Sequence, residues 1–456
     1  MKPEYQGGSN LKRRDFLRSA PIAGLALTGA CAVSQAQPQA SNASPVKPER
    51  SESTVKDELH FSKAEYDRRY SGIRKRMQRD GLDAILVTGS TESYRADLGH
   101  LKYLGAPIDA ERTYLLVPLE QDPILFNRIP GFPVFKELGP GGPPVLPSDA
   151  PSPVKFDVAM AKPREGTLFA GDHASAITEQ LKALGLMNAN IGIASMRVLP
   201  ADVFAALKEN LPNARFIDAE RLMMEMRYYK SPEEQAFLRR SGAMADLAFS
   251  AASSAVKVGA NDIDVYYAAD RACVEAGGPL GGFQLISSGP WGGKSSNPIF
   301  QTGSQRVLQN GDLMIPEIGS DYKGYFTQLV APVSIGEPTD EVYEALQLCE
   351  AVRQHNLDQL AAGKTVREID QACLEFTKDL SNGEYGSVFG VQAGEPELTF
   401  WHDDYELKPG SLAYNQPFLL PLKRPGGPFH MTGDAVLVTE TGTESLHKTP
   451  MEMLVV

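Results

Sequence analysis

The chain has 456 residues, of which 42% are hydrophobic and 22% charged, and its formal net charge is −12. A chain of this length exceeds what one hydrophobic core usually holds, so we expect two folded domains. The acidic balance argues against nucleic acid and anionic membranes as partners, since both attract positively charged surfaces. An ordinary solvated acidic surface is the simpler interpretation.

The amino terminus predicts an export signal. Arg13 and Arg14 stand just before a Phe-Leu pair, residues 21–33 are apolar, and small residues lead to Ala36. A basic start, a short apolar run and a small-x-Ala exit are typical of a signal peptide, and the arginine pair resembles a twin-arginine signal. The apolar run is too short to span a membrane comfortably. We therefore predict that residues 1–36 direct the folded protein to the periplasm or medium, leaving no membrane span in the mature chain.

The cysteines predict neither a disulfide framework nor a zinc site. Cys273, Cys349 and Cys373 would remain after cleavage, and their wide spacing matches neither pattern. Each lies in a helix-like pattern, where cysteine behaves as a small hydrophobic residue. Lipidation at Cys31 is an alternative that Thr28 disfavours, because threonine is a poor match three residues before a lipidated cysteine.

The next part of the chain predicts a linker and a first domain. Residues 37–56 are rich in Pro, Ser, Ala, Lys and Glu, which predicts a flexible linker. Strand and helix patterns then alternate over 57–220, beginning with a capping-box helix at Ser62, and this alternation predicts an α/β domain. Segment 129–155 is too rich in Pro and Gly for regular structure, and we interpret it as a rim loop over a cleft. The expected helices are 62–80, 176–184 and 201–211, and the expected strands are 81–88, 114–118, 123–126, 167–170, 191–194 and 215–218.

The pattern changes after residue 220. A serine cap, Ser231, followed by Pro and two Glu is a strong helix start. The segments 256–264 and 360–370 look like one motif used twice, each joining a pair of helices. Helices outside and strand pairs inside, duplicated, predict a pseudo-symmetric α+β domain over 221–456. The expected helices are 232–256, 263–276, 340–361 and one that ends near 380.

A hairpin over residues 311–336 forms the centre of this second domain. Its first strand is expected over 313–318 and its second over 325–335, joined by the glycine-flanked turn 319–324. Glu317 and Gln328 would then face one cavity from neighbouring strands. A carboxylate inside an apolar run is costly to bury unless something satisfies it, which makes Glu317 the first functional candidate.

Several short sequence motifs resemble those of one known family and occur in the same order along the chain. They are Tyr229-Lys-Ser-Pro-Glu-Glu234, Gly311-Asp-Leu313, Gly324-Tyr325, Phe389-Gly-Val391, Glu406-Leu-Lys-Pro-Gly410 and residues 433–442, with residues 98–105 and 112–118 in the first domain. Together they resemble the creatinase, aminopeptidase P and prolidase family. The resemblance implies a pita-bread fold for 221–456, a smaller creatinase-like α/β domain over 57–220, and a homodimer.

The resemblance also implies what this chain has lost. Members of the family usually hold two divalent metals through two Asp, one His and two Glu. Matched one at a time, those positions fall at Glu317, Gln328, Ser387, Gln416 and Gly433. One carboxylate cannot hold two divalent cations, so we expect no metal and no other cofactor. The alternatives are a shifted alignment, with Asp321 or Asp434 as a ligand, and a site that has simply decayed.

Creatinase is the family's example of catalysis without metal, and it uses a His as proton shuttle beside a Pro-containing loop. The matching segment here, residues 294–298, places Ser296 where that His stands. The creatinase mechanism is therefore not carried over, and creatine is a poor candidate substrate.

The remaining residues divide into two sets. The catalytic candidates are Glu317, His402, His430 and Tyr325, and the substrate-binding candidates are Gln328, Ser296, Asn297, Ser387, Tyr414 and Gln416. Burial among apolar residues would raise the pKa of Glu317 toward the range of a useful acid/base. Either histidine could be the missing proton shuttle, and Tyr325 or Tyr414 could donate to a developing anion. The alternative for each is a structural role, as a tied carboxylate, a surface histidine or a core aromatic.

We therefore expect an exported, metal-independent hydrolase or lyase that acts on a small polar molecule with an amide or other C–N bond. One alternative is an Xaa-Pro aminopeptidase or dipeptidase with an atypical metal site. The other is a non-catalytic binding protein on a lapsed peptidase fold.

Overall fold

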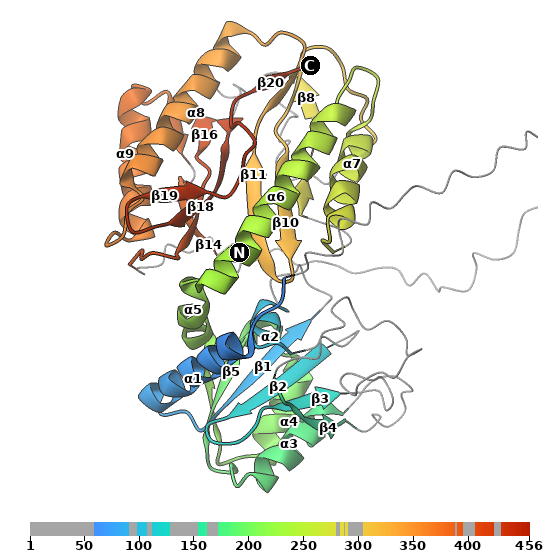
Figure 1. The fold of residues 1–456 in the computed structure, drawn as a ribbon, viewed down its shortest axis with the longest axis vertical. Coiled ribbons are helices and arrows are strands. Elements are labelled where there is room, and N and C mark those ends of the chain that lie inside the picture. The colour runs from blue at the N-terminus through green and yellow to red at the C-terminus, as the bar shows by residue number, and fades with distance from the viewer. Residues whose placement is uncertain are drawn as a thin grey trace, which may run out of the picture. The chain divides into compact units, whose positions relative to one another are not determined.

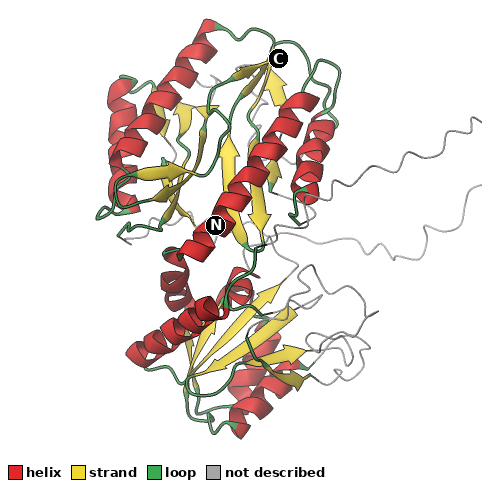
Figure 2. Cartoon of the chain, viewed as in Figure 1, coloured by secondary structure: helices red, strands yellow, loops and turns green. Residues whose placement is uncertain are grey.

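The computed structural model describes residues 59–90, 98–106, 112–127, 154–161, 172–279, 283–286, 288–290, 304–387, 390–394, 406–423 and 430–456 (Figures 1 and 2). They lie in one compact unit, Ser53–Val456. The predicted signal peptide, the linker and strand 167–170 fall outside the described residues, as does all but the end of the predicted rim loop. Among the described helices, none has both the length and the apolar composition of a membrane span.

The first part of this unit is a mixed six-stranded sheet in the order β4-β3-β2-β1-β5-β6. Its strands are β1 (Ala84–Ser90), β2 (Arg112–Pro118), β3 (Ile124–Asn127), β4 (Asp157–Met160), β5 (Asn190–Ala194) and β6 (Arg215–Asp218). Its helices are α1 (Lys63–Asp80), α2 (Gly99–Tyr103), α3 (His173–Ala183), α4 (Ala201–Asn210) and α5 (Glu220–Tyr228). The sequence predicted most of these elements but not β4, α2 or α5.

Alternation along β1 explains why both faces of this sheet are covered. Ile85 and Val87 pack in one cluster with residues of α1, α2 and α5. Ala84 and Leu86, one residue out of step, pack in another cluster with residues of α3 and α4. Successive side chains of a strand point to opposite faces, so a continuously apolar strand is buried on both sides.

The second part contains the predicted pairs of long helices and the sheets that they cover. The helices are α6 (Pro232–Ala255), α7 (Asp262–Glu275), α8 (Asp340–Gln359) and α9 (Val366–Leu380). A seven-stranded sheet has the path β14-β15-β18-β11-β10-β7, with β19 beside β18; smaller sheets have the orders β20-β12-β9-β8 and β13-β16-β17. The strands are β7 (Gln284–Leu285), β8 (Ser288–Pro290), β9 (Asp312–Met314), β10 (Glu317–Tyr322), β11 (Tyr325–Val330), β12 (Val333–Ile335), β13 (Tyr385–Ser387), β14 (Val391–Gly394), β15 (Leu412–Asn415), β16 (Phe418–Pro421), β17 (His430–Met431), β18 (Gly433–Val438), β19 (Thr443–Ser445) and β20 (Leu454–Val455).

The second helices of the two pairs begin in the same way, in agreement with a duplicated motif. The second helix of each pair starts at a capping box, with Asn261 as the cap of α7 and Thr365 as the cap of α9. Each cap residue also forms an isolated antiparallel bridge, Asn261 with Val307 and Thr365 with Glu406. In Figure 1 the two pairs lie to either side of the strands between them.

The central hairpin differs from the prediction at its turn. The predicted turn 319–324 is wrong, because β10 continues to Tyr322 and pairs there with Tyr325. Lys323 and Gly324 form a two-residue turn with φ values of 53° and 95°. Two positive φ values match the twist of an antiparallel pair, and glycine adopts them without strain.

A buried arginine joins the two parts of the unit. The Arg69 side chain on α1 is fully buried and donates hydrogen bonds to Glu65 (2.8 Å), to the Tyr103 carbonyl (2.6 Å) and to the Tyr325 hydroxyl (3.0 Å). Its guanidinium also lies 4.0 Å from the centre of the Phe61 ring. Burial would favour a neutral group, but these partners hold the pKa of Arg69 above its ordinary value.

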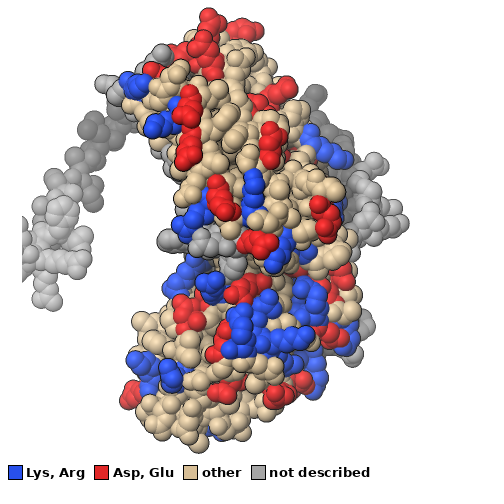
Figure 3. Space-filling view, turned by 90° about the vertical axis from the view of Figure 1, so that its left-hand side faces the viewer, with Lys and Arg blue, Asp and Glu red and all other residues tan. Residues whose placement is uncertain are grey.

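Charged side chains of both signs are interspersed on the face drawn in Figure 3. Positive side chains of α1 are paired with acids. Arg79 contacts Asp80 at 2.6 Å and Glu225 of α5 at 2.8 Å, and Arg76 contacts Glu225 at 3.4 Å. These pairs are partly exposed, so each contributes little to stability.

We predict that Arg69→Met costs about 3–5 kcal/mol of unfolding free energy, because the buried Glu65 carboxylate, Tyr103 carbonyl and Tyr325 hydroxyl all lose the charged donor that they share. Arg68 is the matched control: it also contacts Glu65, but its side chain is 42% exposed. Arg68→Met should cost below about 1 kcal/mol. Urea denaturation of both variants measures the difference, and equal losses would contradict the buried junction.

Candidate functional site

The strand register decides which side chains of the hairpin face the same way. Glu317 stands opposite Val330, and Gly319 stands opposite Gln328. Paired residues share a face and neighbours along a strand alternate, so Glu317 and Gln328 lie on one face of the sheet. Their neighbours Ile318 and Leu329 lie on the other face, in a core cluster with residues of α6 and α7.

The same alternation holds in the other half of the sheet. Val391, Ala413 and Val436 pack in a cluster that includes residues next to and within α9. The residues beside them in each strand therefore lie on the opposite face, together with Glu317 and Gln328. We call this the inner face, defined by Glu317, Gln328, Gln392, Tyr414 and Gln416.

Three predicted residues meet on the inner face. Gln328 donates from Nε2 to Gln416 Oε1 at 2.5 Å, and Gln416 Nε2 lies 3.5 Å from the backbone carbonyl oxygen of Gln328. The Gln328 amide also forms a hydrogen bond with the Glu317 carboxyl. All three side chains are buried. We call Glu317, Gln328 and Gln416 the buried triad.

Glu317 is the titrating group of the triad. Burial raises its pKa to about 8, and the hydrogen bond from Gln328 opposes the rise only in part. Beside it, Val330 packs with Ile315, Phe418 and Met431 in an apolar cluster. An apolar neighbourhood disfavours the charged form, so Glu317 is mostly a neutral acid at pH 7.

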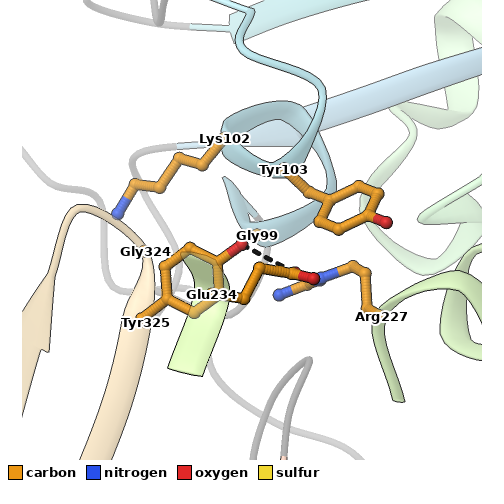
Figure 4. Close-up of a pocket in the computed structure, with 7 residues that line it drawn as sticks. All are labelled: Gly99, Lys102, Tyr103, Arg227, Glu234, Gly324 and Tyr325. Carbon is orange, nitrogen blue, oxygen red and sulfur yellow. Dashed lines mark hydrogen bonds between the residues drawn. The ribbon is translucent and has the colours of Figure 1, made fainter. Parts of the chain in front are cut away.

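Tyr325, predicted as a catalytic candidate, lies on the face of the sheet opposite to Glu317. It stands opposite Tyr322, on the face occupied by Ile318 and Leu329. Its hydroxyl donates to Glu234 at 2.8 Å and accepts from Arg69 at 3.0 Å. It lines a small pocket whose other lining residues come from α2, α5, α6 and the hairpin turn (Figure 4).

That pocket is separate from the buried triad, none of whose members lines it. Figure 4 shows Glu234 and Tyr325 joined by their hydrogen bond, with Arg227 and Tyr103 beside them. Lys102 at the same pocket lies 3.4 Å from Asp321. Its charged groups serve the junction between the two parts of the unit.

Tyr414 does lie on the inner face, directly opposite Gln392. Its hydroxyl donates to the Phe326 carbonyl at 3.0 Å. That bond occupies the proton that the prediction assigned to a developing anion. The ring itself is buried in a core cluster with Leu412, Ala435 and Leu437.

His430 and Ser387 lie away from the triad, which corrects their predicted placement. Leu419 on β16 stands opposite both residues, with Ser387 on β13 to one side and His430 on β17 to the other. Leu419 packs with Cys349 and Cys373 of α8 and α9. Burial lowers the pKa of His430 to about 4, so it is neutral at pH 7 and a poor proton shuttle.

The other predicted site residues have no described position. Ser296, Asn297 and His402 lie outside the described residues. Their predicted roles therefore stay predictions.

Gln392 is the inner-face residue that the sequence did not single out. It lies on β14 with its side chain buried. A glutamine inside a short apolar strand was the available signal. Its face depended on a register that no local pattern in the sequence fixes.

The side chains of the buried triad do not fit a pair of divalent metals. The triad supplies one carboxyl and two uncharged amides, whereas two divalent cations need several anionic oxygens. Within the described ranges, His, Cys, Asp and Glu nowhere gather in threes in a way that could hold a metal. Gly433, at the fifth ligand position, has a φ of 150°, and a side chain there would collide with the Asn415 carbonyl.

The two replacement ligands have other partners. Asp321 accepts from the Gly324 amide at 2.6 Å and lies beside Lys102. Asp434 accepts from Arg353 at 2.9 Å and from the Ser445 hydroxyl at 2.5 Å. A carboxylate engaged in this way does not complete a metal site in the triad.

The fold and this site define the class of protein. The solved structure of an Xaa-Pro dipeptidase from Bacillus anthracis matches with a TM-score of 0.68 at 20% identity, over 86% of this chain and 100% of that one. An X-Pro aminopeptidase from Thermotoga maritima matches with a TM-score of 0.68 at 18% identity, over 85% and 99%. The chain has the pita-bread fold, and the predicted α+β class is confirmed.

Sequence comparison gives the family. Residues 236–440 match metallopeptidase family M24. A creatinase from Bacillus sp. (strain B-0618) is 22% identical over 86% of this chain and 92% of its own length. The match to family M24 supports the family that the short motifs of this chain predicted.

Glu317 makes stability depend on pH. Its pKa is raised from 4.5 to about 8 on folding, so the folded state keeps a proton that the unfolded state releases between these values. Stability is then full below about pH 4.5 and falls by up to about 1.4 kcal/mol per pH unit until pH 8. We predict that Glu317→Gln matches the native protein at pH 4.5 and exceeds its stability at pH 8. Urea denaturation at both values tests this, and a difference independent of pH would contradict it.

Proposed function

We propose that this protein is a metal-independent hydrolase that cleaves a C–N bond in a small uncharged molecule, with Glu317 as its acid/base. The observation that carries the proposal is the buried triad: one carboxyl hydrogen-bonded to Gln328, whose amide also holds Gln416. A protonated carboxyl with a pKa near the working pH is suited to proton transfer.

The chemistry needs one proton donor and one water. The Glu317 carboxyl gives its proton to the leaving nitrogen while water adds to the carbonyl carbon. The carboxylate that remains takes the excess proton from the added water, so one amide and one water give one acid and one amine. Among the described residues Gln416 Nε2 has a single 3.5 Å contact, and we assign it as the donor to the substrate carbonyl.

A second candidate follows from the comparisons. The similar structures include enzymes named Xaa-Pro dipeptidase and X-Pro aminopeptidase, and the family is described as metallopeptidases. A peptidase of that kind would require metal. Metal dependence therefore separates it from the proposed function.

The test uses the mature protein against a panel of small amides, ureido compounds and Xaa-Pro dipeptides, with amine release as the readout. We expect turnover to persist after dialysis against a chelator, with far less than one metal ion per chain by elemental analysis. Glu317→Gln should lower kcat by roughly 10²–10⁴, the usual contribution of a positioned acid/base. The exposed Glu344→Gln is the matched control and should leave kcat unchanged.

The pH profile gives an independent reading. Because the proton donor is lost as Glu317 ionises, kcat should fall above about pH 8. Activity only with added metal would support the metallopeptidase. Ligand binding without turnover on any compound would support a binding protein on the same fold.

A further inference from the structure

Gln392 extends the polar inner face beyond the buried triad. It stands directly opposite Tyr414, while its neighbour Val391 stands opposite Asn415 and packs in the core on the other side. Gln416 follows Asn415 and so returns to the inner face. Gln392 and Gln416 are thus diagonal neighbours on adjacent strands, a relation that places Cα atoms about 7–8 Å apart.

Two amide oxygens on this face are buried without a donor. Gln392 Oε1 and Gln328 Oε1 have no hydrogen-bond partner in the described part of the chain. Gln392 is only 6% exposed, and Gln328 only 1%. A buried acceptor without a donor is costly, and a ligand that supplies N–H groups would remove the cost.

The described residues next to the two oxygens offer them no hydrogen-bond donor. The Gln328 amide nitrogen is already used by Gln416, so the free oxygen is fixed by that bond. The Tyr414 ring lies beside Gln392, and its hydroxyl is used by Phe326. The face therefore offers two acceptors with aromatic surface next to one of them.

The strand order sets the scale of a ligand that meets both acceptors. Gln328 lies on β11 and Gln392 on β14, with β18 and β15 between them. Three strand spacings separate their backbones by about 14 Å, and two inward glutamine side chains shorten the gap between their oxygens.

We propose that Gln392 is a second binding residue of this site, and that the ligand is an elongated uncharged molecule with N–H donors at both ends and an apolar middle. One donor meets Gln328 beside Glu317, and the other meets Gln392 beside Tyr414. The proposal rests on the function proposed above, since it takes the Glu317 end as the place of reaction.

Linear aliphatic diamides, from malonamide to suberamide, are the probes, with hexanamide as a monoamide and dimethyl suberate as a compound without N–H donors. Calorimetric titration into Glu317→Gln avoids turnover. We expect the best diamide to bind about tenfold more tightly than the monoamide, the gain of one good hydrogen bond. In the double variant Glu317→Gln with Gln392→Met, the diamide should bind less than about twofold more tightly than the monoamide, while monoamide binding persists. Gln392→Glu keeps an acceptor oxygen and should keep the advantage.

Gln284→Met is the matched control. Gln284 is also buried in this sheet with Oε1 unpartnered, but it stands opposite Ile318 on the other face, and its nitrogen donates to the Gly319 carbonyl. It should leave the diamide advantage intact. Thermal unfolding of each variant confirms that it is folded.

Equal binding of diamide and diester, or an advantage that survives Gln392→Met, would overturn the proposal. Turnover of the same diamides by the native protein separates the two proposals. A Gln392-dependent advantage without hydrolysis overturns only the proposed function. Hydrolysis without that advantage overturns only the second binding residue.

Discussion

The antiparallel register of β10 and β11 is the constraint on which the site depends. The two-residue turn at Lys323–Gly324 fixes that register, and the register sends Glu317 and Gln328 to one face and Tyr325 to the other. A shift by one residue would exchange the two sets and place a carboxyl in the core against α6 and α7. Because the helix-facing set is apolar or internally bonded, the fold permits one register, and the buried triad follows from it.

The sequence was informative wherever a signal was local. Ser231 predicted the start of α6, and the apolar runs predicted β1, β2 and β11 near their observed places. It failed where the answer depended on alternation across strands. Tyr325 and His430 were each close in sequence to the expected site, but each points to the other side of its sheet. Gln392 was missed for the same reason, since the facing of a residue in a four-residue strand is decided by its partner.

The buried triad also shows what replacing carboxylates with amides does to a site. Where the family usually gathers several anions, this chain has one acid whose charge burial disfavours and two amides that hydrogen-bond without charge. In the function proposed above, such a site gives up the attraction for cations and acquires a proton donor that is protonated at neutral pH. The signal peptide and the homodimer are separate predictions, based on the leader and on the family.

The prolines of the central hairpin have a further consequence for how the protein unfolds. Pro316 and Pro332 interrupt the two long strands, so the outer segments β9 and β12 pair in the four-stranded sheet and the inner segments β10 and β11 pair in the seven-stranded one. One continuous hairpin therefore supplies strands to both sheets. Neither sheet can open without pulling on the strands of the other, which makes them a single cooperative unit and ties the order of the buried triad to the integrity of both.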